Sequence, residues 1–307
     1  MSGNRLYLSM SRYLRQRYGE RVQKVSLNAG FTCPNRDGTK AVGGCVYCNN
    51  ESFNFSPEAS VRDQLALGIE KARRKYGARK VIAYFQTYTN TYGSPEFLCD
   101  TYSTIREFPV VVGLSIGTRP DCVPEEVLRV IQEFVLTHEV WIEYGLESSN
   151  DESLLKMNRA HTFAEFKDAV LRTAGRGMRI AAHIITGFPW ETREVMIQTG
   201  RDAAALPIDG IKIHNLHIVR GTALELMHLR HRFQLLTLEE YASVVSQILE
   251  LLPPEMIIQR LTAECPSDLL VAPDWTNRKT EILEAIQREL ISRDSYQGKM
   301  FALPQLP

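Results

Sequence analysis

Three cysteines within one glycine-rich segment are the residues of this chain best suited to chemistry. Cys33, Cys45 and Cys48 are separated by eleven and then two residues. Thiols gathered in this way indicate metal ligation. Three thiolates can hold three irons of a [4Fe–4S] cluster, and the fourth iron is then open to a small molecule. The spacing therefore predicts a cluster that reacts with a bound ligand rather than one that only carries electrons.

Two other kinds of metal site are alternatives for these cysteines. A structural zinc site needs four ligands, and the nearest further cysteine in the sequence is Cys99, so a distant histidine would have to complete it. An electron-transfer cluster also needs a fourth cysteine. We expect Cys99, Cys122 and Cys265, which are isolated in the sequence, to be small buried residues. Zinc stays open as an alternative to iron at this point.

The composition is that of an ordinary globular chain. Of its 307 residues, 44% are hydrophobic and 23% are charged, and the formal net charge is zero. This length allows one large α/β domain with a small extension. A run of about 18 apolar residues and a signal-peptide apolar segment are both absent, so we expect a cytoplasmic protein with no membrane contact. Binding of nucleic acid would need a local basic patch, since the chain as a whole is not basic.

Apolar, β-branched segments alternate with amphipathic segments along the chain, which predicts a parallel sheet with helices outside it. The predicted strands are residues 22–28, 80–86, 110–117, 139–146, 179–185 and 210–217. The predicted helices between them are residues 57–76, 95–107, 124–136, 162–175 and 191–206. Beyond residue 235 we expect a helix over 237–252, a strand over 256–262 and a helix over 278–293. The expected architecture is α/β: a partial (β/α)6 TIM-like barrel over residues 1–235, with the cysteine loop at 30–49, and a small α+β C-terminal extension over 236–307.

Side-chain alternation predicts that one face of this sheet is polar. Residues two apart on a strand share a face, so Glu143 and His183 lie opposite the apolar residues of their strands. Lys212 and His214 do the same on the sixth strand. A sheet covered by helices on both faces would be apolar on both, whereas one polar face is typical of a partial barrel that binds a ligand. The alternative is a buried glutamate–lysine ion pair with hydrogen-bonded histidines.

Short segments spread over nearly the whole chain match one group of enzymes. They are residues 31–38 and 43–49 around the cysteines, and 84–86, 89–91, 117–122, 143–148, 210–217 and 272–275. By these segments the chain resembles radical S-adenosylmethionine (radical SAM) enzymes of the YhcC/YtqA type, which are related to the radical SAM core of the Elongator catalytic subunit. The usual superfamily motif has three residues between the first two cysteines, whereas eleven separate Cys33 from Cys45. Trp190 is a further departure, since relatives usually carry glycine at that position.

The resemblance implies a [4Fe–4S] cluster held by the three cysteines, with SAM chelating its open iron. One electron, from a donor such as flavodoxin or ferredoxin, would cleave SAM to methionine and a 5′-deoxyadenosyl radical that abstracts hydrogen from the substrate. The residues implied to contact SAM are Tyr47, Gln86, Thr87, Glu143, Glu147, Ser148, His183, Gly187 and Val219. The candidates for substrate contact are Arg119, Lys212 and His214. For Arg119 a structural tie to Asp121 is the alternative, and no residue is assigned a catalytic role.

The resemblance leaves the substrate unidentified, and the N-terminal segment gives one clue. Residues 5–24 hold five arginines and one lysine against one glutamate, with three tyrosines interleaved, which suits RNA phosphates and bases. Together with the Elongator resemblance, this makes tRNA modification one hypothesis. The alternative is an amphipathic helix that packs Leu6, Tyr13 and Leu14 on the barrel.

Other functions also stay open. The substrate can instead be a small molecule or a peptide, or the protein can be a non-catalytic iron–sulfur or zinc scaffold. In the C-terminal extension, Arg260 and Trp275 are candidates for a lid or for substrate contact. The sequence assigns no oligomeric state.

Overall fold

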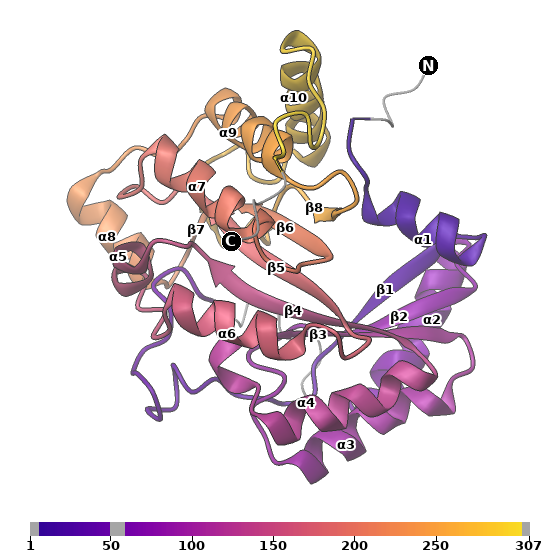
Figure 1. The fold of residues 1–307 in the computed structure, drawn as a ribbon. Helices are drawn as coiled ribbons and strands as arrows, with labels where there is room; N and C mark the ends of the chain where they lie inside the picture. Colours follow the sequence, from indigo (N-terminus) through magenta and orange to yellow (C-terminus); the bar gives the residue numbers. More distant parts are fainter. Residues whose placement is uncertain (1–5, 50–58, 303–307) are drawn as a thin grey trace.

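Seven parallel strands form the main sheet of the computed structural model, which describes residues 6–49 and 59–302 (Figure 1). In order across the sheet they are β1 (Val22–Leu27), β2 (Lys80–Phe85), β3 (Val111–Thr118), β4 (Glu139–Glu147), β5 (Arg179–Thr186), β6 (Gly210–Asn215) and β8 (Ile257–Arg260). The first six lie where the alternation predicts them. The sheet is a half-barrel, so the predicted α/β class is confirmed. The predicted division at residue 235 stays a prediction, and the structure adds that β8, from beyond it, pairs with β6.

Helices in the connections cover the outside of the half-barrel (Figure 1). Those between the first six strands are α2 (Val61–Tyr76), α3 (Pro95–Ser103), α4 (Glu125–Gln132), α5 (Asp151–Lys156), α6 (Phe163–Thr173) and α7 (Arg193–Ala204), with short 3-10 turns at η2 (Thr104–Glu107), η3 (Pro120–Cys122) and η4 (Glu133–Leu136). Ser60, Thr162 and Thr192 begin three of the helices, because each side chain accepts a bond from an otherwise unpaired backbone N–H. The helix predicted from residue 57 therefore begins at Val61, and residues 57 and 58 lie outside the described residues.

The strands present an apolar face to these helices and a mostly polar face to the inside, as the alternation predicts. Ile142, Ile180 and Ile211 pack outward in the main core. Inside, we distinguish a lower end, at the amino ends of the strands, from an upper end, at their carboxyl ends. An apolar layer that includes Trp141 and Ile257 fills the lower end. The polar residues therefore lie in the middle and upper parts of the barrel.

Helix α1 (Met10–Tyr18) closes the lower end between the two edge strands. It contacts β1 and β8, and the backbone N–H of Ile258 donates to the carbonyl of Leu8 at 2.8 Å. Leu14 packs into the apolar layer, and the Tyr13 ring meets Trp141 edge-on with 6.3 Å between ring centroids. The prediction of an amphipathic helix packed on the barrel is thus confirmed for Tyr13 and Leu14.

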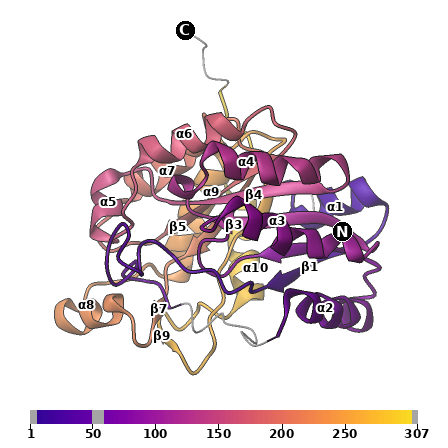
Figure 2. The ribbon, with the colours of Figure 1, turned by 90° about the horizontal axis from the view of Figure 1, so that it is seen from below.

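The remaining elements lie beyond β6. They are β7 (Ile218–Val219), α8 (Ala223–His231), α9 (Leu238–Leu251), β9 (Leu270–Ala272) and α10 (Lys279–Ser292). Helix α9 packs between α7 and α10, and β7 pairs with β9 in antiparallel fashion. Figure 2 shows α8 at the edge of the molecule beside β7. In the part of the chain that the structure describes, none of the helices combines the length and the apolar character needed to cross a membrane.

Candidate functional site

Two adjoining cavities open at the upper end of the half-barrel. One, of about 180 Å³, is lined by Cys33, Cys45 and Cys48, and we call it the cysteine cavity. The other, of about 680 Å³, lies over the inside of the sheet and reaches Lys212 and His214, and we call it the barrel cavity. Both are lined by Tyr47, Cys48, Tyr84, Gln86, Glu147 and His183. A molecule in the barrel cavity therefore lies next to the cysteines, as expected for the ligand-binding end of a parallel α/β barrel.

The cysteine loop is held in place by backbone and amide hydrogen bonds. The N–H groups of Arg36 and Asp37 donate to the Cys33 carbonyl at 2.8 and 3.1 Å, and the Cys48 N–H donates to the Cys45 carbonyl at 3.0 Å. Between the last two cysteines, the Val46 N–H donates to the Met157 carbonyl at 2.9 Å. These bonds fix the three thiols around one cavity without using their sulfur atoms.

Donors surround the sulfur atom of Cys45. Asn35 Nδ2 lies 3.4 Å from Cys45 Sγ, and Arg159 Nη1 lies 3.6 Å from it. Arg159 also forms an ion pair with Glu147, with 3.3 Å between Nη2 and Oε1. Glu147 itself has a φ of 68°, a left-handed conformation that is rare outside glycine, at the end of β4. The strained backbone thus carries Glu147 to the place where it meets both cavities.

The surroundings of the three thiols suit ligands of an iron–sulfur cluster better than they suit three free thiolates. The pKa of the Cys48 thiol is raised to about 12. Burial is the main cause, the neighbouring Cys45 and Cys33 act in the same direction, and Arg36 partly offsets them. Thiolates this close need a compensating positive charge, which irons supply together with buried cations. Two guanidinium nitrogens here, Arg119 Nη1 and Arg159 Nε, are buried and have no hydrogen-bond partner among the described residues. The residues therefore fit a [4Fe–4S] cluster. No three His, Cys, Asp or Glu side chains in the described ranges are arranged to ligate a single ion.

Glu143 is the centre of a buried ionic network at the middle level of the barrel. Its Oε1 accepts bonds from Lys24 Nζ and from Ser115 Oγ, both at 2.6 Å. Its Oε2 accepts from His183 Nε2 at 3.0 Å and from Lys212 Nζ. Lys24 Nζ also donates to Gln259 Oε1 at 2.9 Å, which links edge strands β1 and β8 across the barrel. This is the buried ion pair that the sequence analysis left as the alternative, and it forms the floor of a ligand cavity.

The network shifts the pKa values of its members in opposite directions. Burial alone would raise the pKa of Glu143, but Lys212, Lys24 and His183 hold it well below its usual range. The pKa of Lys212 is lowered to about 7. Burial is the main cause and Lys24 acts in the same direction, while Glu143 partly offsets them. Burial and Lys212 lower the pKa of His183 to about 4. At neutral pH, Glu143 is therefore ionised and His183 is neutral, donating its Nε2–H to the carboxylate.

The residues implied to contact SAM do not all reach the cavities. Seven of them line one or both cavities: Tyr47, Gln86, Thr87, Glu143, Glu147, His183 and Val219. Ser148 and Gly187 are not in either lining. Ser148 Oγ donates to Glu191 Oε1 at 2.6 Å, and Gly187, with a φ of 114°, lies beside Leu216 and Leu236. Both carboxylate oxygens of Glu143 are already bonded to protein groups.

The substrate candidates separate into two groups. Lys212 and His214 line the barrel cavity, as does Arg260. Arg119 lines the cysteine cavity, and its Nε and Nη2 form a two-point bond with Asp121 at 2.9 and 3.0 Å. Both interpretations of Arg119 thus have a basis, since the tie to Asp121 leaves Nη1 without a hydrogen-bond partner among the described residues. Trp275 is buried against Tyr241, and its Nε1–H donates to the Leu236 carbonyl, away from the site.

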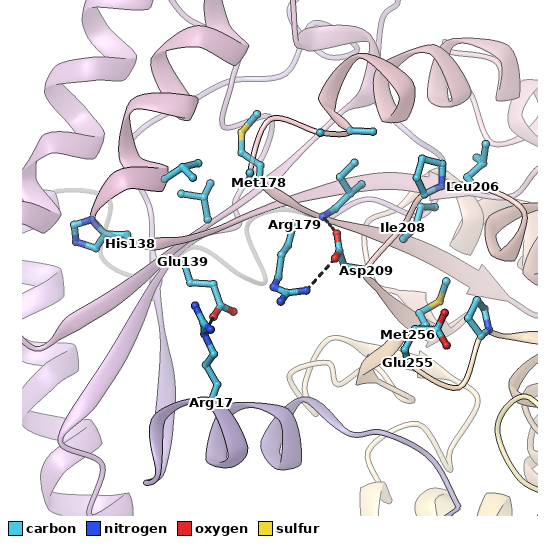
Figure 3. Close-up of a pocket in the computed structure, with 18 of the residues that line it drawn as sticks. Arg17, His138, Glu139, Met178, Arg179, Leu206, Ile208, Asp209, Glu255 and Met256 are labelled. Atoms are coloured by element: carbon cyan, nitrogen blue, oxygen red, sulfur yellow. Dashed lines mark hydrogen bonds and ion pairs between the residues drawn. The ribbon is translucent and has the colours of Figure 1, made fainter.

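A third hollow, of about 1430 Å³, lies at the lower end of the barrel (Figure 3). Its most prominent charges are paired, because Arg17 lies 3.3 Å from Glu139 and Arg179 lies 2.9 Å from Asp209. It contains no cysteine and lies at the amino ends of the strands, the end of such barrels that serves stability rather than catalysis. The upper end is therefore the candidate site.

Several residues of the site are not predicted from the sequence. Lys24 and Ser115 complete the Glu143 network, and alternation along their strands, with Lys24 opposite Val25, was a usable signal. Arg159 had no periodic signal, because it lies in a turn between Asn158 and Ala160, whose φ angles are 53° and 54°. Only the folded loop brings this guanidinium beneath Cys45.

Known proteins resemble this chain over nearly its whole length. It is 38% identical to the uncharacterized protein YtqA of Bacillus subtilis over 298 residues, 96% of this chain and 92% of that protein. It is 37% identical to protein YhcC of Escherichia coli, with 96% and 95% covered. A shorter part, 59% of this chain and 39% of the relative, is 26% identical to a tRNA uridine(34) acetyltransferase of Dehalococcoides mccartyi.

A solved structure shares the fold of this chain, and comparison with protein families shows the family to which the chain belongs. The Elp3 protein of the archaeon Methanocaldococcus infernus, solved with an N-terminal deletion, superposes with a TM-score of 0.68 at 19% identity over 90% of this chain and 64% of that one. The chain matches the Radical SAM C-terminal domain over residues 208–292. Residues 32–203, which include the three cysteines, match the Radical SAM superfamily. The chain belongs to the radical SAM superfamily.

Proposed function

We propose that this protein binds a [4Fe–4S] cluster through Cys33, Cys45 and Cys48 and cleaves SAM reductively to abstract hydrogen from a substrate in the barrel cavity. The observation that carries the proposal is the juxtaposition of the two cavities, which share six lining residues. When bound, the reduced cluster supplies the electron that splits the sulfonium–C5′ bond of SAM into methionine and a 5′-deoxyadenosyl radical. With the cluster and SAM held by these residues, a hydrogen atom of the substrate would be transferred, and 5′-deoxyadenosine would be the product.

The chain's own residues supply position and charge for this chemistry. Asn35 and Arg159 donate toward Cys45 Sγ, which stabilises a thiolate ligand. Arg119 Nη1 and Arg159 Nε are unpartnered cationic donors at the cysteine cavity and suit the carboxylate of SAM. Tyr47 packs on Phe188, with 5.8 Å between ring centroids, and forms a wall common to both cavities. This aromatic wall covers part of the site of the radical, from which water must be excluded.

Metal analysis tests the cluster assignment. Protein prepared and reconstituted without oxygen should contain about four irons and four sulfides per chain and absorb visible light as iron–sulfur proteins do. The triple variant Cys33→Ala/Cys45→Ala/Cys48→Ala should lose this iron. Cys99→Ala is the matched control and should keep it, because Cys99 lies on α3, is only partly buried and lines neither cavity. Stoichiometric zinc with no sulfide in the wild type would instead support the scaffold alternative.

For the substrate we propose tRNA, and the support comes from the relatives. One of them is a tRNA uridine(34) acetyltransferase, and the Elp3 structure shares this fold. The basic helix α1 adds no direct support, because Tyr13 packs on Trp141 and Arg17 pairs with Glu139 at the end of the barrel opposite the cysteines. RNA held by α1 would therefore have to extend along the outside of the barrel to reach the barrel cavity.

Mass spectrometry of nucleosides from cells with and without the protein tests this substrate. A modified nucleoside that disappears with the protein supports tRNA, whereas an unchanged nucleoside profile with an altered metabolite contradicts it and favours a small molecule. Binding provides a second measurement. If RNA extends along the outside of the barrel to α1, replacing Arg12, Arg15 and Arg17 by Ala should weaken tRNA binding and reduce its salt dependence, whereas unchanged binding removes α1 from the path of the RNA. The matched control is Arg62→Ala/Arg73→Ala/Arg74→Ala on α2, which should bind as the wild type does.

A further inference from the structure

Lys212 on the floor of the barrel cavity belongs to an ionic network with one carboxylate, Glu143, and a second ammonium group, Lys24, which is partly exposed and lies outside the cavity lining. Lys24 and Lys212 both bind Glu143, one at each oxygen. In the described part of the chain, neither lysine has a second carboxylate within ion-pair distance. His183, the other partner of Glu143, is neutral near pH 7 because burial and Lys212 lower its pKa. When both lysines are protonated, the network therefore holds one positive charge more than its carboxylate compensates.

The wall above this floor adds further donors. Arg260 faces the cavity, and its only recorded carboxylate partner in the described ranges is Glu264 at 3.7 Å, which lies closer to Lys279 at 3.1 Å. His214 lines the same cavity, and its buried Nε2 has no hydrogen-bond partner among the described residues. The remaining acidic residue in the lining, Glu147, pairs with Arg159. Cationic and donor groups thus outnumber the available carboxylates around the cavity.

An excess of this kind has a physical cost that a ligand can remove. A buried charge without a counter-charge is strongly unfavourable, and so is a buried polar atom without a partner. An oxyanion in the cavity would satisfy Lys212, His214 and Arg260 together. The carboxylate of SAM is not the natural occupant, because the cysteine cavity has its own unpartnered donors on Arg119 and Arg159.

We propose that Lys212, His214 and Arg260 bind an acidic group of the substrate, a carboxylate or a phosphate, in the barrel cavity. The proposal rests on the proposed function only in identifying the bound molecule as the substrate. It places the acidic group on the floor and wall of the barrel, so that the rest of the molecule extends toward the cysteine cavity. Arg260 offers a two-point contact to such a group, and Lys212 offers a point charge.

The charges that face Lys212 predict how this binding depends on pH. They come from Lys24 on β1, Tyr84 on β2, Glu143 on β4, His183 on β5, and His214 and Arg260 on β6 and β8. Burial lowers the pKa of Lys212 to about 7, and an anion beside it would raise that pKa. Binding should therefore take up a proton near neutral pH, and affinity should fall as the pH rises from 7 to 9.

Isothermal titration calorimetry of the anaerobically reconstituted protein with inorganic phosphate and, separately, succinate tests the proposal. The titrations are made at pH 7 without SAM and at constant ionic strength. We expect at least one probe to bind, Lys212→Met to weaken it at least tenfold, and Arg260→Gln to weaken it severalfold. Lys71→Met, an exposed lysine on α2, should leave the affinity within twofold of the wild type. The probe that binds identifies the acidic group as phosphate or carboxylate.

Two results would overturn the proposal. One is that neither probe binds the wild type, and the other is that both cavity variants bind as tightly as the wild type. Lys212→Met leaves Glu143 with Lys24 and His183, so the fold should persist. If Lys212→Met does not fold, the affinity of Arg260→Gln tests the proposal instead, because the Arg260 side chain is 40% exposed and its replacement should not disturb the fold. The titration measures binding and not SAM cleavage. If the protein does not cleave SAM, the binding result still stands, and if neither probe binds, the proposed SAM cleavage is still tested separately.

Discussion

Replacing Glu143 by Gln removes the carboxylate that Lys24, His183 and Lys212 share. The wild-type carboxylate is fully buried and accepts bonds from Lys24, Ser115, His183 and Lys212. A glutamine has the same shape, but it leaves the buried Lys212 and the partly exposed Lys24 with no carboxylate and turns an N–H₂ group toward one of them. The substitution therefore tests whether this network is a true ionic centre of the fold.

The structure sets the size of the expected effect. Removing one partner from a buried ion pair costs about 3–5 kcal/mol, because the other charge is left uncompensated. Glu139→Gln is the matched control on the same strand. Its ion-pair partner Arg17 has 58% of its side chain exposed, so water replaces much of that interaction. The amide oxygen of glutamine can still accept the bond from Trp141 Nε1, and with the bond from Tyr18 weakened a loss of about 1 kcal/mol is expected. Adding Lys212→Met to Glu143→Gln should recover at least about 1 kcal/mol, since it removes one of the stranded charges.

Urea denaturation at pH 7 measures these free energies of unfolding. The difference between wild type and Glu143→Gln should shrink at low pH. Because the pKa of Glu143 is held below its ordinary value of 4.5, its contribution is present above that pH and is lost as the pH falls through the lower, folded value. A loss below about 1 kcal/mol at pH 7, or the absence of recovery in the double variant, would refute the ionic network as a stabilising centre.

Three further predictions concern other parts of the structure. Gly145→Ala places a Cβ 2.4 Å from Arg159 Nη2 and 2.5 Å from Glu147 Oε1, so the ends of these two side chains must shift. Iron retained after reconstitution should fall, and unchanged iron would contradict the role of Arg159. The pKa of Lys212 is about 7 in the folded state and 10.5 when exposed, so the unfolded state binds more protons between these pH values. The free energy of unfolding should therefore rise with pH across this window in the wild type but not in Lys212→Met. Urea titrations at pH 7 and pH 9.5 measure this difference. Leu14→Ala, at the base of the barrel, should lose about 2–4 kcal/mol, whereas Leu67→Ala, 68% exposed on α2, should change the free energy of unfolding by less than about 0.5 kcal/mol; equal losses would contradict the closing role of α1.

Side-chain alternation and cysteine spacing predicted the features of the fold that depend only on residues close together in the sequence. Alternation on single strands was enough to place Glu143, His183 and Lys212 on the inner face, because the period of a strand is fixed by its backbone. The cysteine spacing was enough to predict one cavity lined by three thiols. These features need no knowledge of how the strands are arranged.

Features that depend on the curvature of the sheet were beyond the sequence pattern. Lys24 on β1 meets Glu143 on β4 because the half-barrel brings strands together that are not neighbours in the sheet. For the same reason the strand at 257–260 joins the main sheet next to β6, where its sequence position predicted only a separate extension. Glu147 and Arg159 reach the cysteine cavity through left-handed backbone positions, which side-chain type alone does not reveal.

The central claim is that the cysteine cavity supports reductive cleavage of SAM. The most direct measurement is chromatography for 5′-deoxyadenosine after incubating anaerobically reconstituted protein with SAM and dithionite. We predict that the wild type and Cys99→Ala form 5′-deoxyadenosine, and that Cys45→Ala, which removes the sulfur bonded by Asn35 and Arg159, forms none. Intact SAM after many hours, in wild-type protein with a full complement of iron and sulfide, would contradict the claim.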